Sequence, residues 1–141
     1  MPRIPAAVQR RIRTQARNRC GYCLSPQSLV IGTLEIEHLL PQAKGGSDDE
    51  ANLWLACSVC NKHKSDKISA TDPETGETVP LFNPRTQNWF EHFQWSEDGL
   101  RVIGLTTIGR ATVEALHLSD NPRVLVVRSN WVRAGWHPPK E

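Results

Sequence analysis

The segment LEIEHLLPQAKGGSDDEANLWLACSVCNKHK, residues 34–64, begins with alternating apolar and acidic residues and ends near a Cys-x-x-Cys pair. The alternation predicts a short strand over 34–38, ending at a Glu-His pair, and a second short strand is expected over 29–31. A polar loop with two glycines follows, and then an isolated Asn52. A short helix is expected to begin at the last cysteine and to end at about residue 68. We therefore expect the rest of the chain to position this segment.

The cysteines form two Cys-x-x-Cys pairs, which are Cys20, Cys23, Cys57 and Cys60. Structural zinc prefers four ligands in a tetrahedron, and thiolates are common among them. The 33 residues between the two pairs exceed the roughly 15–20 of the common zinc-binding pattern. They contain both the Glu-His pair and Asn52. We expect a structural zinc that clamps the two ends of this segment; a redox dithiol or four unlinked core cysteines are the alternatives.

His38 is the candidate centre of the chemistry. Neighbouring residues of a strand point to opposite faces, so one of Glu37 and His38 can hold a metal while the other faces a water. Asn61 in the following helix, or His63, can project back toward the same site. A hard cation such as Mg²⁺ accepts carboxylate and amide oxygens and could neutralise charge on a phosphodiester, while His38 takes a proton from the attacking water. A structural histidine, a solvated glutamate and a turn-forming Asn52 are the alternatives.

The order of these motifs resembles the HNH endonuclease family in its four-cysteine, zinc-bearing form. The resemblance covers residues 20–66, and it rests on the Glu-His pair, the Gly-Gly-Ser-Asp-Asp loop, the Asn-Leu pair and the Cys-x-x-Cys-Asn-x-x-Lys end. It implies an α+β fold whose core is the ββα-metal, treble-clef-like arrangement of two strands and a helix. We expect a structural zinc in this core and a mixed hairpin and helix extension after it.

The resemblance also implies roles for four residues. His38 takes the place of the general base, Asn52 pins the loop and orients His38, and Asn61 occupies the third motif position, which is a metal ligand. Glu37 takes the acidic metal-binding position before the base. Here asparagine stands where the third histidine is expected, which makes this an H-N-N variant. Because an amide oxygen suits Mg²⁺ or Mn²⁺ better than imidazole does, we expect one of these as the catalytic ion; His63 stays open as an alternative ligand.

The length of 141 residues, with 38% hydrophobic and 23% charged residues, is typical of one soluble domain. We expect residues 1–70 to hold an Arg-rich helix and the nuclease core. Residues 71–141 are expected to pack on that core as an extension, in a single compact domain. Neither a secretory signal nor an apolar run of membrane-spanning length is visible, and paired cysteines favour metal in a reducing compartment. We therefore expect a cytoplasmic protein with no membrane partner.

The first 19 residues contain no acid and six arginines, which are Arg3, Arg10, Arg11, Arg13, Arg17 and Arg19. A helix is expected over 5–18, with an apolar stripe of Val8, Ile12 and Ala16 and arginines on another face. Because a guanidinium pairs with phosphate through a planar fork of donors, this block favours a polyanionic partner. A solvated helix face is the alternative.

The extension is expected to contain a hairpin, with strands over 93–95 and 100–105, followed by helices over 107–118 and 121–134. The apolar stripe expected on the last helix is Val124, Val127 and Trp131. Four of the five tryptophans lie in this half. We expect them to serve in packing, and a stacking surface for bases is the alternative.

Together these patterns predict a metal-dependent endonuclease that hydrolyses DNA, with double-stranded DNA as its partner. The resemblance implies products with 3′-hydroxyl and 5′-phosphate ends. A zinc-stabilised nucleic-acid-binding module without catalysis is the alternative from another class, and a protein-interaction or toxin-like role is a third. The sequence leaves open the target sequence, the preference between DNA and RNA, and the oligomeric state.

Overall fold

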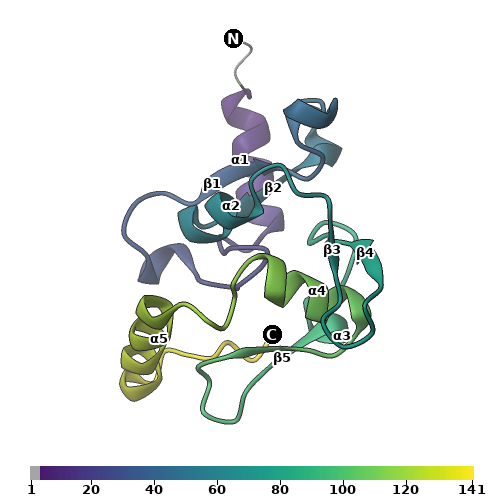
Figure 1. Ribbon diagram of the computed structural model, residues 1–141. Helices are drawn as coiled ribbons and strands as arrows, with labels where there is room; N and C mark the ends of the chain where they lie inside the picture. Colours follow the sequence, from purple (N-terminus) through teal and green to yellow (C-terminus); the bar gives the residue numbers. More distant parts are fainter. Residues whose placement is uncertain (1–3) are drawn as a thin grey trace. The chain divides into compact units, whose positions relative to one another are not determined.

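Figure 1 shows the computed structural model of the protein, which describes residues 4–141; Arg3 lies outside the described residues. The chain divides into two compact units. The first unit comprises the chain up to Ile68 together with Asn83–Thr86, and the second comprises Ser69–Phe82 and Gln87–Glu141. The expectation that both halves pack as a single compact domain stays a prediction. None of the helices in residues 4–141 is both long enough and apolar enough to cross a membrane.

The first unit contains two α-helices, one hairpin and three short 3-10 turns. They are α1 (Ala6–Gln15), η1 (Gln27–Leu29), β1 (Glu35–His38), η2 (Gln42–Lys44), η3 (Glu50–Asn52), β2 (Leu53–Ala56) and α2 (Ser58–Lys64). Together with the four-cysteine cluster, the mixed helices and small hairpin sheets confirm the predicted α+β class.

The predicted apolar stripe of α1 forms one side of the core of the first unit. Ile12 and Ala16 are buried there with Leu34, Leu53 and Leu55, and Val8 packs against the group. The helix ends before Arg17 and Asn18, whose positive φ angles of 55° and 53° reverse the chain toward the first cysteine pair. The stripe therefore docks α1 on the hairpin.

Strands β1 and β2 pair antiparallel, with Glu35 opposite Ala56 and His38 opposite Leu53. Because side chains alternate across a strand, Ile36 turns toward the core while Glu35 and Glu37 turn to the other face. The apolar segment that follows Asn52 is the strand β2, which pairs with β1 and was not predicted. The hairpin thus carries a glutamate face.

The loop between the strands folds back tightly on the end of β1. Gly45 has a φ of +89°, and a Cβ at Gly46 would lie 1.7 Å from the carbonyl oxygen of Leu40. The amide of Gly46 donates to the carbonyl oxygen of Pro41 at 2.9 Å. Only glycine fits at position 46, so the Gly-Gly pair is what lets the loop close over this strand end.

The second unit contains two hairpins and three helices. They are β3 (Ser69–Thr71), β4 (Thr78–Pro80), α3 (Trp89–His92), β5 (Phe93–Trp95), β6 (Val102–Gly104), α4 (Thr107–Ala115) and α5 (Pro122–Ala134). The predicted hairpin and the two predicted helices are confirmed, whereas β3 and α3 were not predicted. Helix α5 begins where expected, because the Asn121 side chain accepts from the amide of Arg123 and Pro122 occupies the first turn.

Two local predictions are wrong. Residues 29–31 do not form a strand: the chain makes the turn η1 there, and the side chain of Ile31 is fully exposed. The stripe expected on α5 is also incomplete. Val127 is exposed, while Arg128 is buried and donates to the carbonyl oxygens of Leu100 and Leu118 at 2.9 and 2.7 Å. Backbone acceptors left by neighbouring turns, which periodicity does not reveal, draw this arginine inward.

A buried carboxylate ties β3 to α4 in the second unit. The Asp72 side chain is 0% exposed and accepts two hydrogen bonds from the Arg110 guanidinium, at 3.0 and 2.9 Å. It also accepts from the amide of Glu74 and the hydroxyl of Thr75. The hydrogen bonds from the Arg110 guanidinium are the main reason that the pKa of Asp72 is well below its ordinary value. The residue is thus a fixed anion at neutral pH.

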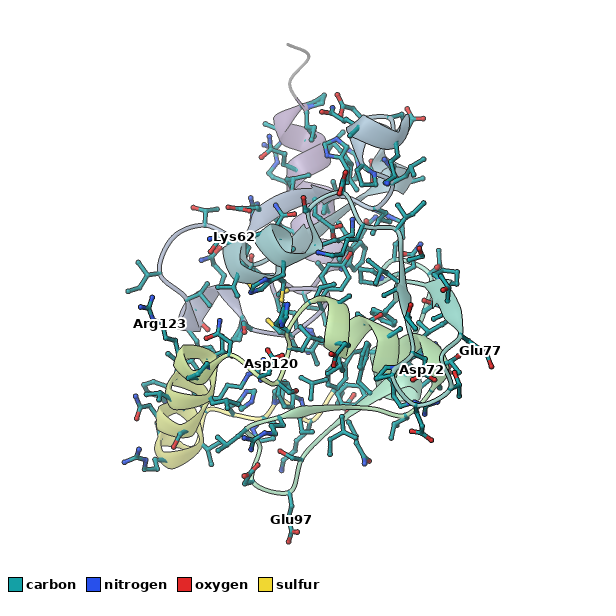
Figure 2. All side chains as sticks on the ribbon, viewed as in Figure 1. Lys62, Asp72, Glu77, Glu97, Asp120 and Arg123 are labelled. Carbon is teal, nitrogen blue, oxygen red and sulfur yellow. The ribbon has the colours of Figure 1, made fainter. Side chains whose placement is uncertain are left out.

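We expect Asp72→Asn to lower the melting temperature of this unit by several degrees at pH 7. The depressed pKa contributes stability above the unfolded value of about 3.9, and this contribution is lost as the pH falls through the folded value. The gap between wild type and variant should therefore narrow between pH 4 and pH 2. Thermal scans across this range measure it, with the exposed neighbour Glu77→Gln as the matched control (Figure 2). Equal melting temperatures at pH 7 would refute the role.

Candidate active site and metal centre

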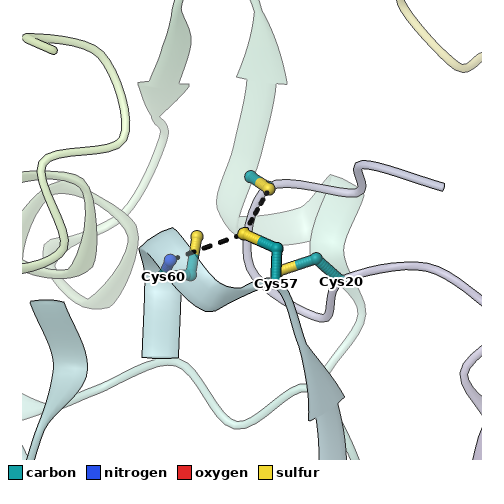
Figure 3. A group of neighbouring side chains, drawn as sticks. Cys20, Cys57 and Cys60 are labelled. Atoms are coloured by element: carbon teal, nitrogen blue, oxygen red, sulfur yellow. Dashed lines mark hydrogen bonds between the residues drawn. The ribbon is translucent and has the colours of Figure 1, made fainter. Parts of the chain in front are cut away.

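The four cysteines come together in the first unit as the sequence predicts. Their sulfur atoms all lie within 4.8 Å of one another, and those of Cys23 and Cys57 are 3.7 Å apart (Figure 3). A tetrahedral zinc with bonds of about 2.3 Å separates its sulfurs by about 3.8 Å. No disulfide joins them, since all four are free thiols. The donor set and its spacing therefore suit a structural zinc.

The backbone of each Cys-x-x-Cys turn supports the sulfurs. The amide of Tyr22 donates to Cys20 Sγ at 3.4 Å, and the amide of Cys60 donates to Cys57 Sγ at the same distance (Figure 3). In the first turn a Cβ at Gly21 would lie 2.5 Å from the Trp54 ring. Glycine at position 21 is thus required by close packing against β2, and its φ is not positive.

Because the thiols are crowded together, the pKa values of Cys20, Cys23 and Cys60 shift in different directions. Burial raises the pKa of the Cys20 thiol well above its ordinary value, and hydrogen bonds from the other sulfurs raise that of Cys60. By contrast, hydrogen bonds from Cys20, Cys57 and Cys60 hold the pKa of Cys23 well below its ordinary value. Without a metal, the cluster stabilises a thiolate at Cys23 through hydrogen bonds from the neighbouring sulfurs. A divalent metal would compensate the negative charge of several thiolates at once.

Glu37 forms a buried ion pair with Lys64. Its side chain is 1% exposed and lies 2.9 Å from Lys64 Nζ, itself 3% exposed. The Tyr22 hydroxyl donates to both carboxylate oxygens, at 2.7 and 3.0 Å. Burial raises the pKa of Glu37, and the positive charge of Lys64 and the Tyr22 hydroxyl oppose that rise. Lys64 is therefore buried in an ion pair and does not lie on the solvated face of α2.

His38 stands at the end of β1 with its ring held by the loop. Its Nε2 lies 2.7 Å from Asp48 Oδ1, and Gln42 donates to the same oxygen at 3.1 Å. The His38 side chain is 23% exposed. On the backbone side, Lys64 Nζ donates to the carbonyl oxygens of His38 and Leu39, at 3.1 and 3.3 Å. The imidazole is thus fixed in orientation and still reachable from solvent.

Asn52 ties both ends of the loop together. Its amide oxygen accepts from the amide of Leu40 at 2.8 Å, while its amide nitrogen donates to the carbonyl oxygens of Leu40 and Ser47, at 3.0 and 2.8 Å. Its own carbonyl oxygen accepts from the amide of Leu39. These contacts hold the residues that follow His38 against the residues that flank Asp48. The imidazole and its carboxylate partner are therefore kept close together.

Asn61 contacts Glu35, a glutamate to which the sequence analysis assigned no role. Its Nδ2 donates to Glu35 Oε1 at 2.8 Å on the exposed edge of the hairpin. No hydrogen bond joins Asn61 to Glu37 among the contacts of residues 4–141 that the structure gives. His63 is half-buried two residues farther along α2, which turns its side chain away from the face of Asn61. The predicted roles of these residues stay predictions.

Several arginines lie on α1 or just after its end. Arg10 and Arg17 are exposed and Arg13 is half-buried. Arg11 instead makes a two-pronged ion pair with Glu50, with closest atoms 2.8 Å apart, and this partner raises the pKa of Arg11. Part of the basic block is therefore neutralised within the unit, and the remaining arginines supply a positive helix face.

The structure gathers the four cysteines as predicted. It places His38 at the start of the loop that the Asn52 side chain closes. Within residues 4–141, no hydrogen bond is seen between Glu37 and Asn61. Sequence reasoning gave no role to three side chains that the geometry singles out, which are Tyr22, Glu35 and Asp48. Strand alternation could have pointed to Glu35, because it shares the face of Glu37. Nothing in the sequence distinguishes Asp48 from the acid beside it.

Residues 20–67 match the family model described as HNH endonuclease, and this match confirms the resemblance seen in the sequence. The matched segment contains all four cysteines, the β1–β2 hairpin and α2. Neither the comparison with curated proteins nor the comparison with solved structures gave a match. Residues 20–67 are therefore similar to HNH endonucleases, and the four-cysteine cluster within them fits the zinc-bearing type.

Proposed function

We propose that this segment makes the chain a metal-dependent HNH endonuclease that hydrolyses DNA phosphodiester bonds. One observation carries the proposal: within the matched segment, the His38 ring lies at the end of β1, 2.7 Å from Asp48 and partly open to solvent. An oriented imidazole is the group most often used to take a proton near neutral pH. The Asn52 contacts keep that orientation fixed.

In this proposal His38 is the general base. When Nε2 carries the ring hydrogen, Asp48 accepts it and Nδ1 keeps the lone pair that removes a proton from water. The resulting hydroxide attacks phosphorus, the bond to the 3′ oxygen breaks, and that oxygen takes a proton from solvent. The products are the 3′-hydroxyl and 5′-phosphate ends that the family resemblance implies.

Mg²⁺ or Mn²⁺ would supply the positive charge that offsets the charge developing on the phosphate oxygens. Glu35 and Asn61, which meet between β1 and α2, carry a carboxylate and an amide group, and the oxygens of both groups are ligands that such an ion accepts. Asn61 would hold it from α2. The resemblance assigns the carboxylate ligand to Glu37, and Glu35 is the second carboxylate on the same face of β1.

The free arginines of α1 support DNA as the substrate, because backbone phosphates are the sequence-independent target of such a face. We expect Arg10→Ala with Arg13→Ala to weaken binding to duplex DNA. The slope of log K against log salt should become shallower by about 1.8, since two phosphate contacts are lost at about 0.9 each. Fluorescence anisotropy across a salt series measures this slope. Arg101→Ala, an exposed arginine of the second unit, is the control; an unchanged slope in the double variant would remove α1 from the interface.

A zinc-stabilised nucleic-acid-binding module without catalysis is the second candidate. The observation that favours it is the burial of Glu37, whose carboxylate pairs with Lys64 and accepts a hydrogen bond from Tyr22. End-labelled double-stranded DNA, single-stranded DNA and RNA of one sequence distinguish the two functions. We expect cleavage of the duplex with either ion, and ligation of the product to reveal its 5′-phosphate. Binding to all three without cleavage of any would support the second candidate.

A further inference from the structure

We propose that Glu35, together with Asn61, holds the catalytic divalent cation, and that Glu37 is a positioning residue that fixes the backbone at His38. The proposal rests on the proposed endonuclease function and deepens it by exchanging the roles of two glutamates on one strand. Both glutamates lie on the same face of β1, two residues apart. Their surroundings differ in exposure, in charge and in the partners that they contact.

The environment of Glu37 leaves no room for a cation. A hydroxyl donor and an ammonium already occupy its carboxylate, at 2.7 and 2.9 Å, and its side chain is 1% exposed. A divalent ion there would lie beside the buried positive charge of Lys64, and like charges at this distance repel strongly where water is excluded. Opening the site would also leave Lys64 buried without its counter-ion, which is costly.

Glu35 has the opposite environment. It is exposed, and its Oε1 accepts from Asn61 Nδ2 at 2.8 Å. A half-turn of the Asn61 amide replaces its NH₂ group by its oxygen, so that two oxygen donors face the same point. Exposure also leaves space for the water ligands that Mg²⁺ and Mn²⁺ retain. The Glu35 carboxylate and the Asn61 amide group thus meet at an open edge of the hairpin, where the flipped amide would present its oxygen.

The contacts of Glu37 explain why it is nevertheless needed. Glu37 holds the Lys64 ammonium, and this ammonium donates to the carbonyl oxygens of His38 and Leu39. Tyr22, the other partner of Glu37, lies between Cys20 and Cys23. Glu37 therefore connects the first cysteine pair, helix α2 and the strand end that carries the imidazole. Its role is to position His38.

The test uses calorimetry to compare Mn²⁺ binding by the wild type and by three variants, each as the zinc-loaded 141-residue protein without DNA. We expect Glu35→Gln to weaken Mn²⁺ binding by at least about tenfold, as loss of ligand-sphere carboxylates does, with unchanged zinc content and melting temperature. Glu37→Gln should lower the melting temperature, while its folded fraction binds Mn²⁺ as the wild type does. Glu97→Gln, at the exposed turn of the second unit, is the matched control (Figure 2).

Glu35→Gln with wild-type Mn²⁺ affinity overturns the assignment, whether or not Glu37→Gln folds. If that variant also cleaves DNA normally, the endonuclease proposal survives and only the ligand assignment fails. Folded Glu37→Gln that has lost Mn²⁺ binding likewise returns the ligand role to Glu37. A zinc-loaded wild type that binds no Mn²⁺ and cleaves no DNA overturns both proposals together.

Discussion

Replacing His38 by alanine is expected to slow DNA cleavage by about 10²–10⁴-fold, the usual contribution of a general base. DNA affinity should stay close to that of the wild type, because Arg10 and Arg13 of α1, which are proposed to contact the backbone, are unchanged. The His38 side chain is part-exposed and its main partner is Asp48. Its removal should therefore leave the fold intact. Single-turnover cleavage of a labelled duplex, with anisotropy for binding, separates the two effects.

Two further variants make this result specific. Asp48→Asn keeps a hydrogen-bond partner for the ring and removes its charge, so we expect a smaller loss of rate than for His38→Ala. His117→Ala changes an exposed histidine of the second unit and should cleave like the wild type. A His38→Ala protein that cleaves at the wild-type rate would exclude His38 as the base and would redirect the mechanism to another group.

Loss of the zinc site is expected to unfold the first unit. Structural zinc contributes about 10–16 kcal/mol in small zinc-binding peptides near neutral pH, which is as large as the whole stability of a typical domain, about 5–15 kcal/mol. Cys57→Ser removes one of four clustered sulfurs and the acceptor of the Cys60 amide. The rest of the cluster would then be left incomplete between α2 and the hairpin.

Metal analysis should give about one zinc per wild-type chain, and chelation should abolish the thermal transition of the first unit. We expect Cys57→Ser to bind little zinc and to lack that transition, whereas Ser58→Ala at the neighbouring exposed position should behave as the wild type does. A wild-type protein that is folded and free of zinc would contradict the clamp. The cysteines would then be ordinary core residues.

Features carried by local signals were predictable from the sequence. The stripe through Ile12 and Ala16 is buried as expected, and the alternation before His38 gave β1. The start of α5 followed from an asparagine cap and a first-turn proline. In each case a residue's role depends on neighbours within a few positions, and such neighbours are visible in the sequence.

Features set by distant partners were not predictable. Glu37 is buried because Tyr22 and Lys64, far away in sequence, meet its carboxylate there. Asp48 contacts His38 because the loop closes over the end of β1. The contact between Glu35 and Asn61 likewise depends on where α2 lies against the hairpin. Spacing predicted β1 and the helix after the last cysteine pair, and only the packing distinguishes the two glutamates on β1.

The tryptophans of the second half illustrate the same division. Trp89 and Trp131 are buried, and Trp89 stacks near Phe93 with ring centroids 5.1 Å apart, as the packing interpretation expects. Trp136, by contrast, is 63% exposed. Composition predicts that aromatic residues dominate a small core. It does not reveal which of them remains on the surface, because that depends on how α5 ends.

The measurement that tests the central claim most directly is the conversion of supercoiled plasmid to nicked or linear form by the zinc-loaded wild type. The proposed mechanism predicts conversion with Mg²⁺ or Mn²⁺, none when both are withheld, and a rate about 10²–10⁴-fold lower for His38→Ala under the same conditions. A wild-type protein that binds the plasmid and leaves it intact with either ion would contradict the endonuclease proposal.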